Sequence, residues 1–302
     1  MTLAAVDRPV SSRFDDKFLR KLESLVLTIR RTTAGRMHGS RRSRRVGAGL
    51  EFADHRDYVA GDDLRYLDWN LYGRLGRLAL RLYEEDEDLS IDLLVDASAS
   101  MRMGTPPKLD LALQLGAALA YVGLANLDRV AVTALDGEGS GLPPARGKGQ
   151  ILPILHFLDQ VRPIARTSLT ASVRGFLARR SSRRRGLVVL ISDFYDAAGA
   201  RAALELIRRH RLRAIAIQVS APDELAPVLR GDVRLCDVET GEERELTVSP
   251  SVLAACARRH ATLLRGLQGY CRAQAIPSFA VSSAEPFDAL VLRMFRTGGL
   301  LR

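Results

Sequence analysis

From residue 89 onwards the chain alternates short apolar runs with helical segments, and this alternation limits the folds it can adopt. The apolar runs are too short for helices and are dominated by Val, Leu, Ile and Ala, as expected of strands buried on both faces. They lie at residues 89–95, 129–135, 187–191, 214–219 and 278–282. The helical segments that accompany them lie at residues 109–127, 151–161, 169–179, 198–209, 251–273 and 286–296. The pattern predicts an α/β fold with a doubly wound, mostly parallel sheet that helices cover on both faces.

Three segments depart from this rhythm. Two alternating runs within residues 233–248 flank a Glu-Thr-Gly-Glu turn, which predicts a β-hairpin inserted at about 230–249. The segment 136–149 is rich in Gly and Pro, and we expect it to be a loop. Near the N-terminus, spaced apolar residues over 14–31 predict an amphipathic helix.

The segment between this helix and the alternating strands and helices that begin at residue 89 has a different composition. Residues 51–70 are dense in charged and aromatic side chains around a Gly-Asp-Asp turn. Such a mixture suits a hydrogen-bonded loop or a pair of strands better than a helix. We therefore expect two regions, an N-terminal helix with a β extension over residues 1–84 and an α/β domain over residues 85–302.

Cysteine use and hydropathy exclude several classes of protein. The three cysteines cannot all pair and show no Cys-x-x-Cys spacing, which argues against a disulfide framework and a cysteine zinc site. The longest apolar stretch, 115–125, has eleven residues, whereas a bilayer span needs roughly 20. We therefore expect no membrane span and a cytoplasmic location.

The net charge of +10 raises the question of nucleic-acid binding. Only four of the 45 basic residues are lysines, and the arginines are spread along the whole chain. A surface that binds nucleic acid is usually a localised basic patch. We therefore expect no specific nucleic-acid partner, and the arginine-rich run 41–45 is kept as the basis of a less favoured alternative.

Two of the predicted strands end in an aspartate. The first ends at Asp96 and the other at Asp193. In an open parallel sheet the carboxyl ends of all strands lie along one edge, where ligands bind. Two carboxylates at this edge repel each other unless a cation or a proton lies between them. A helix cap is the alternative role for either aspartate alone.

Hydroxyl residues directly follow the first of these aspartates. The sequence Asp96-Ala97-Ser98-Ala99-Ser100 places Asp96, Ser98 and Ser100 on the same side of an extended segment. A further hydroxyl-rich turn, residues 167–170, precedes the helix that leads to the Asp193 strand. Carboxylate and hydroxyl oxygens without nitrogen or sulfur suit a hard cation, Mg²⁺ or Mn²⁺.

The Asp-x-Ser-x-Ser pattern resembles the metal-ion-dependent adhesion site of von Willebrand factor type A domains. The resemblance implies that Ser98 and Ser100 contact Mg²⁺ directly and that Asp96 and Asp193 act through water. It also implies a threonine ligand. Thr167 matches its expected place before a helix, and Thr170 remains the alternative because Arg166 stands where the family has Gly.

A longer resemblance covers residues 38–70. There the chain has an Arg- and Gly-rich segment, then Glu-Phe, Arg-x-Tyr, Gly-Asp-Asp and Asp-Trp in order. This segment is similar to the signature of the bacterial domain of unknown function 58 family, in which it precedes an A-type domain. Genes of that family commonly accompany MoxR-type AAA+ ATPases, which implies a chaperone or assembly partnership.

The charged residues of this signature are expected to form a hydrogen-bonded ion network that fixes the segment to the sheet, with the apolar Trp69 as an anchor. Direct contact with a partner is the less favoured interpretation. The residues concerned are Arg56, Asp62, Asp63, Arg65 and Asp68.

These observations favour a non-enzymatic, Mg²⁺-dependent protein-binding module whose metal is completed by an acidic residue of a partner. A MoxR-type ATPase or its client is the expected partner. The sequence contains no Gly-x-Ser-x-Gly elbow, no phosphate-binding loop and no His-Glu-x-x-His. A Mg²⁺-dependent hydrolase of phosphoesters remains the first alternative.

Overall fold

The computed structural model of the chain describes residues 13–33, 42–46, 51–86, 90–164, 168–180, 186–225, 231–239 and 241–296. The chain divides into two compact units. The larger unit contains residues 1–29 and 89–301, and the smaller unit contains residues 30–88. Each unit is described separately below.

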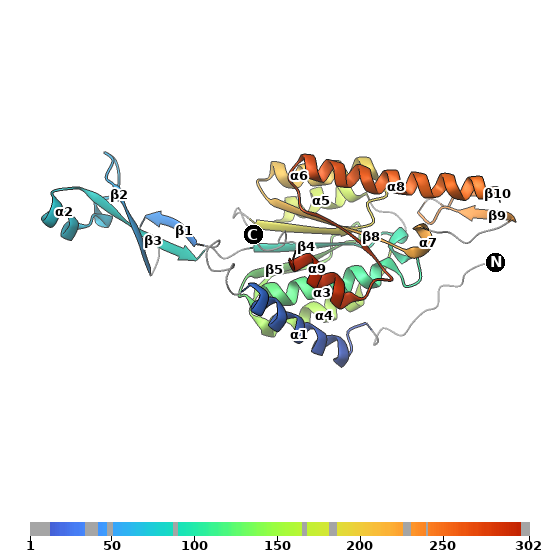
Figure 1. Cartoon of the computed structure of the whole chain (residues 1–302), viewed down its shortest axis with the longest axis horizontal. Helices are drawn as coiled ribbons and strands as arrows, with labels where there is room; N and C mark the ends of the chain where they lie inside the picture. Colours follow the sequence, from blue (N-terminus) through green and yellow to red (C-terminus); the bar gives the residue numbers. More distant parts are fainter. Residues whose placement is uncertain are drawn as a thin grey trace. The chain divides into compact units, whose positions relative to one another are not determined.

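The larger unit is built on a six-stranded sheet with the order β11-β8-β7-β4-β5-β6 (Figure 1). Its strands are β4 (Ser90–Asp96), β5 (Arg129–Leu135), β6 (Gly141–Arg146), β7 (Gly186–Ser192), β8 (Arg213–Ser220) and β11 (Ser278–Ser282). All neighbouring pairs are parallel except β5 and β6, which are antiparallel. The predicted α/β fold with a mostly parallel sheet is confirmed.

Helices cover both faces of this sheet (Figure 1). One face carries α1 (Asp16–Thr33), α3 (Lys108–Ala125), α4 (Ile151–Gln160) and α9 (Phe287–Arg296). The other face carries α5 (Leu169–Arg179), α6 (Ala197–Arg209) and α8 (Pro250–Ala273). The short helix α7 (Pro222–Leu225) follows β8. Strands buried by helices on both sides need apolar residues at every position, which is why they lack the alternation of half-exposed strands.

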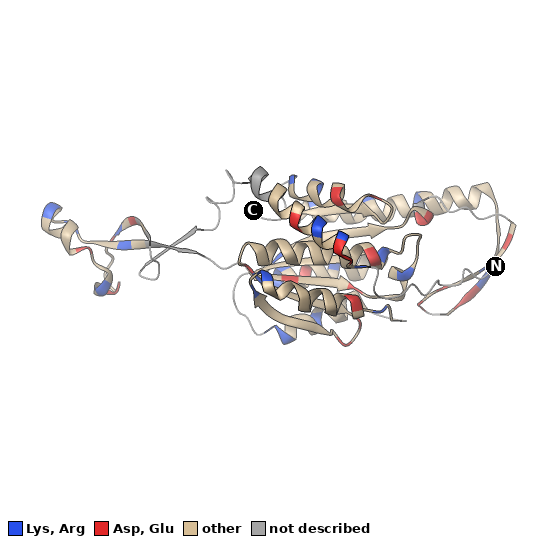
Figure 2. Cartoon of the chain, turned by 90° about the horizontal axis from the view of Figure 1, so that it is seen from below, with Lys and Arg blue, Asp and Glu red and all other residues tan. Residues whose placement is uncertain are grey.

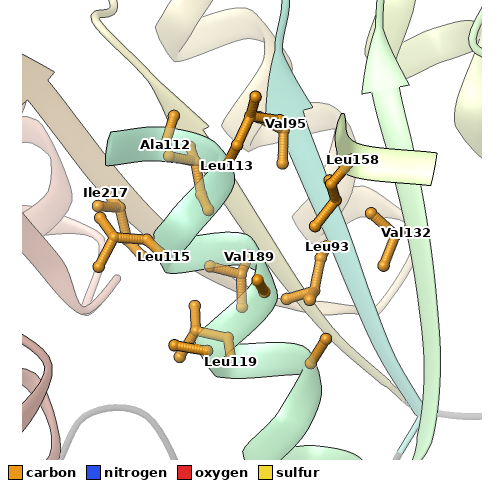
Figure 3. Packing of buried hydrophobic residues seen from close by; sticks show 14 of the residues in the cluster. Leu93, Val95, Ala112, Leu113, Leu115, Leu119, Val132, Leu158, Val189 and Ile217 are labelled. Atoms are coloured by element: carbon orange, nitrogen blue, oxygen red, sulfur yellow. The ribbon is translucent and has the colours of Figure 1, made fainter. Parts of the chain in front are cut away.

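Helix α3 lies at the centre of the core. Leu113 and Leu115 are fully buried and pack towards Leu93 and Val189 of the central strands (Figure 3). By length and composition α3 could cross a membrane, but 83% of this helix is buried inside the larger unit. Its position in the core accounts for its apolar character.

Residues 16–29 of helix α1 belong to the larger unit, which differs from the boundary expected at residue 84. Phe18 and Leu22 are buried in the same core cluster as α3. The ring of Phe18 lies 5.2 Å from that of Phe287, between centroids. The apolar face of α1 is therefore buried against the core of the larger unit, although residues 30–88 separate the helix from the sheet in sequence.

The expected loop at 136–149 contains an edge strand, so that expectation was wrong in part. β6 pairs antiparallel with β5, and the register shifts between Val130 and Val132. Pro143 and Pro144 lie within β6. Proline has no N–H to donate to the hydrogen bonds between strands, but it is tolerated on an edge strand. The proline content therefore indicated a loop where an edge strand is present. The predicted hairpin is present as β9 (Gly231–Cys236) and β10 (Glu243–Val248).

The smaller unit contains a three-stranded antiparallel sheet of β1 (Arg42–Val46), β3 (Ala79–Asp86) and β2 (Glu51–Asp57). It also contains a helix that was not predicted, α2 (Trp69–Leu75). Asp68 caps its start by accepting from the backbone N–H groups of Asn70 and Leu71. Gly76 ends it in the left-handed region, with φ of 63°. These two caps were the available signals for a helix too short to show a periodic stripe.

Ion pairs connect the charged residues of the smaller unit. Asp68 is buried and accepts from His55 Nε2 at 2.8 Å and from Arg81 at 2.9 Å. These partners hold the pKa of Asp68 well below its usual range. Arg56 pairs with Asp62 at 2.9 Å. The charged residues thus form local ion pairs within this unit, and a network that fixes the segment to the sheet of the larger unit stays a prediction.

Trp69 does not serve as a buried anchor within the smaller unit, because 63% of it is exposed. Its ring lies edge-on to that of Tyr72, with centroids 6.3 Å apart. Tyr72 and Leu75 are also exposed, so α2 presents a largely apolar face. In Figure 2, basic and acidic residues are interspersed along the ribbon of the larger unit.

We predict that Asp68→Ala destabilises the smaller unit, because it removes the α2 cap and leaves His55 and Arg81 without their shared acceptor. Amide hydrogen exchange in α2 and β3 should become faster. Since the folded-state pKa of Asp68 is lowered, its contribution is complete above about pH 4 and is lost on acidification. Asp63→Ala, which removes an exposed pair with Arg65, is the control and should change exchange much less. Unchanged protection of α2 in Asp68→Ala would contradict this role.

Candidate functional site

The two aspartates singled out from the sequence end neighbouring strands at the point where the sheet changes direction. From β4 the chain proceeds to β5 on one side, and it later returns to β7 on the other side. Ligands of open α/β sheets bind outside the carboxyl ends of the strands at such a switch point. Asp96 ends β4 and Asp193 follows β7, and both are buried.

A pocket of about 460 Å³ opens at this edge of the sheet. Its walls include four of the five predicted site residues, Asp96, Ser98, Ser100 and Asp193. Sequence reasoning did not anticipate the remaining acidic and hydroxyl residues of the walls. These are Ser192, Tyr195 and Asp196 at and after the end of β7, Glu224 in α7, and Asp237 and Glu239 from the turn between β9 and β10.

The Asp96 carboxylate is held by two donors. Its Oδ1 accepts from the backbone N–H of Ser98 at 2.9 Å, and its Oδ2 accepts from the Ser192 hydroxyl at 2.5 Å. Burial, followed by the negative charge of Asp193, raises the pKa of Asp96 to about 6. Within the described part of the chain, Asp96 forms no salt bridge. The buried charge at the end of β4 is therefore incompletely compensated.

The two serines converge, although not along the extended segment that was expected, because residues 99–102 form a 3₁₀ helix. Ser98 Oγ and Ser100 Oγ lie 3.0 Å apart, and either can donate to the other. The turn that carries them is the 3₁₀ helix Ala99–Arg102, which begins directly after Ser98. A hydroxyl pair beside a buried carboxylate is a set of oxygen donors for a hard cation.

The two threonine candidates differ in what the structure says of them. Thr167 lies outside the described residues, although the segment before it is anchored near the site, where Ile164 N–H donates to Ala97 O at 2.9 Å. Thr170 Oγ1 donates to the carbonyl of Gly199 in α6 at 3.0 Å, and Thr170 is not among the pocket walls. This commitment of Thr170 leaves Thr167 as the better candidate.

The strongest feature missed in the sequence is a buried lysine. Lys108 begins α3 and is fully buried. Its ammonium donates to Asp193 Oδ2 at 2.7 Å and to Glu224 Oε1 at 2.5 Å. A cation at the N-terminus of a helix is opposed by the helix dipole, so its presence there required nearby acids. Lys108 is also the one basic residue within 103–128, and these two signals together could have identified it.

Two backbone conformations bring these groups together. Gly104 has φ of +98°, and an added Cβ would lie 2.3 Å from Ala221 Cβ, so the loop before α3 needs glycine to pack against the end of β8. Phe194 has φ of 55°, which bulky residues rarely adopt. The resulting turn lets Tyr195 N–H donate to Asp193 Oδ1 at 3.2 Å, and the Tyr195 ring centroid lies 4.4 Å from Lys108 Nζ.

The donor set fits a hard divalent cation when hydroxyls are counted. Across the described residues, no three His, Cys, Asp or Glu side chains are grouped as metal ligands. Two carboxylates with Ser98 and Ser100 offer oxygen only, as Mg²⁺ and Mn²⁺ prefer. The described pocket walls contain no histidine that could act as a general base.

The fold and pocket together define an α/β domain with an oxygen-lined site at its switch point, joined to a small β-rich unit. The family described as "Protein of unknown function DUF58" matches residues 54–262, and the chain belongs to that family. The family resemblance noted from residues 38–70 is thereby confirmed.

Similar proteins have been found in mycobacteria. The chain is 33% identical over 269 residues to the uncharacterized protein Mb1516 of Mycobacterium bovis and to the uncharacterized protein Rv1480 of Mycobacterium tuberculosis. In each case the match covers 84% of this chain and 83% of the relative.

Solved structures with VWA-like architecture are also similar to this chain. The conserved hypothetical protein BatB of Bacteroides thetaiotaomicron is 14% identical with a TM-score of 0.42, covering 69% of this chain and 98% of BatB. The SpRpn10 VWA domain is 11% identical with a TM-score of 0.42, covering 70% of this chain and 96% of that domain. The manganese-loaded TRAP protein of Plasmodium vivax is 22% identical with a TM-score of 0.35, covering 44% of this chain and 57% of TRAP.

We predict that Asp96→Asn stabilises the protein in EDTA at pH 8. The folded-state pKa of about 6 lies above the unfolded value of 3.8, so the charged carboxylate costs about 3 kcal/mol of stability at high pH. This cost is complete above pH 6 and disappears as the pH falls towards 4. Chemical denaturation at pH 8 and pH 4 measures the difference. A variant less stable than the wild type at pH 8 would contradict the uncompensated charge.

Proposed function

We propose that the chain is a non-enzymatic protein-binding module whose pocket holds Mg²⁺ or Mn²⁺ through Asp96, Ser98 and Ser100, with Thr167 and Asp193 completing the site. The observation that carries this proposal is the buried Asp96 carboxylate, which faces a second strand-end carboxylate and forms no salt bridge among the described residues. A divalent cation neutralises this charge, and the converging hydroxyls supply its remaining oxygen donors.

A bound cation would offer an open coordination position to a carboxylate of a partner protein. Several residues of the chain orient the oxygen donors around that position. Ser98 N–H and the Ser192 hydroxyl orient Asp96 from two sides, and the turn at residues 98–102 presents both serine hydroxyls. With few full charges supplied directly by the protein, the cation keeps its affinity for an external acid.

A protein is the partner best supported by the second unit. Helix α2 exposes Trp69, Tyr72 and Leu75, and large exposed apolar groups of this kind mark interaction surfaces. The family resemblance favours a MoxR-type AAA+ ATPase, or a client that it remodels, in the cytoplasm. Hydrolysis of phosphoesters stays the alternative, in which a carboxylate of the described pocket walls, rather than a histidine, would have to supply the general base.

We predict that the metal site can be dissected by calorimetric titration with Mg²⁺. Ser98→Ala, Ser100→Ala and Thr167→Ala each remove one proposed ligand and should weaken binding about tenfold or more. Thr170→Ala is the matched control, because that hydroxyl is committed to Gly199, and it should leave the affinity unchanged. A stronger effect of Thr170→Ala than of Thr167→Ala would transfer the ligand role to Thr170.

We further predict that partner binding depends on the cation. Affinity capture should retain the partner in Mg²⁺ or Mn²⁺ and lose it in EDTA, and Ca²⁺ should substitute poorly because it prefers more ligands at longer distances. Changing the acidic residue of the partner to Ala should match the effect of Ser98→Ala. Steady hydrolysis of a phosphoester that disappears in Asp96→Ala would instead identify an enzyme.

A further inference from the structure

The buried ammonium of Lys108 already compensates one of the two strand-end carboxylates. Lys108 has no exposed surface, and lysine is almost never fully buried without an acidic partner. It has two partners, Asp193 Oδ2 at 2.7 Å and Glu224 Oε1 at 2.5 Å, and the face of Tyr195 lies beside it. Asp193 therefore has a cationic partner within the protein, which it shares with Glu224, whereas Asp96 forms no ion pair among the described residues.

This arrangement uses both oxygens of Asp193. Oδ2 accepts from Lys108, and Oδ1 accepts from the backbone N–H of Tyr195. Each oxygen can still accept a second contact, so a cation in the pocket can approach Asp193, directly or through water, but it then shares this carboxylate with the Lys108 ammonium. The ammonium is the partner that a divalent ion repels, so the bond to Lys108 is the one that yields.

We propose that Lys108 is a built-in cation that competes with the divalent ion for Asp193 and thereby sets the metal affinity of the pocket. The inference deepens the proposed function, since it concerns the same site. Lys108 lowers the affinity in two ways, by occupying Asp193 and by placing a positive charge beside the ion.

Glu224 makes the exchange possible. Because Lys108 contacts two carboxylates, it remains paired with Glu224 when Asp193 turns to the metal. Glu224 is itself fixed, since its second oxygen, Oε2, accepts from the backbone N–H of Ala221 at 2.9 Å. Without this second acid, release of Asp193 would leave a buried ammonium unpaired, which is strongly unfavourable.

The test compares Mg²⁺ affinity in Lys108→Met with that of the wild type, by calorimetry at pH 8. Loss of the competing charge should tighten binding on the order of tenfold or more. Lys148→Met, at an exposed lysine, is the control and should bind like the wild type. If the ion pair of Lys108 is purely structural, Lys108→Met should bind Mg²⁺ equally well or more weakly than the wild type. That result would overturn the inference.

A second variant should shift the affinity in the opposite direction. Glu224→Gln leaves the ammonium with Asp193 alone, so Mg²⁺ binding should weaken several-fold. Asp196→Asn removes one charge from the same pocket walls while preserving a helix-capping side chain. It should weaken binding less than Glu224→Gln does. Equal effects would show that general electrostatics, and not the position of Lys108, determine the affinity.

Folding of Lys108→Met must be checked, because the buried Asp193 and the half-buried Glu224 lose their counter-ion. Near-ultraviolet circular dichroism in EDTA and in millimolar Mg²⁺ measures this. We expect Mg²⁺ to raise the melting temperature of the variant more than that of the wild type, or to restore folding if the variant is unfolded in EDTA. If neither Lys108→Met nor Lys108→Gln gains more from Mg²⁺ than the wild type gains, the inference is wrong.

These outcomes separate the inference from the proposed function. If the wild type binds no Mg²⁺ and Lys108→Met does, the proposed function fails while the role of Lys108 holds. If the wild type binds Mg²⁺ and Lys108→Met binds it no more tightly, the proposed function stands and the role of Lys108 is refuted.

Discussion

Two carboxylates buried at the ends of adjacent parallel strands create an electrostatic cost around which the site is organised. Asp96 and Asp193 repel each other in a region that water cannot fully screen. The two carboxylates are stabilised to different extents. Asp193 accepts from the Lys108 ammonium, whereas the donors to Asp96 among the described residues are neutral. The remaining negative charge at Asp96 is the basis of the cation site that we propose.

The fold supplies the rigidity that such a site needs. Central strands buried on both faces, with α3 packed across them, fix where β4 and β7 end. Short turns then place backbone donors beside the carboxylates. Ser98 N–H donates to Asp96, and the strained turn at Phe194 lets Tyr195 N–H donate to Asp193. A site mounted on strand ends is positioned more precisely than one carried by long loops.

Much of this architecture could be predicted from local pattern, because buried strands and amphipathic helices have distinct periodicities. The serine pair and both aspartates were found for the same reason, since each follows directly from a strand end. β6 was missed because its prolines resemble those of a loop, and α2 because a helix of seven residues shows no stripe. The contact between Lys108 and Glu224 was missed because it joins residues 116 positions apart, which no short motif encodes.

The central claim is that a divalent cation binds at Asp96. The most direct measurement is a crystal structure of the wild-type protein grown with Mn²⁺ at neutral pH, with anomalous scattering used to locate the metal. The account predicts an anomalous peak in the pocket at coordinating distance from the Ser98 and Ser100 hydroxyls, beside Asp96. A well-ordered pocket without a manganese peak, at saturating Mn²⁺, would contradict it.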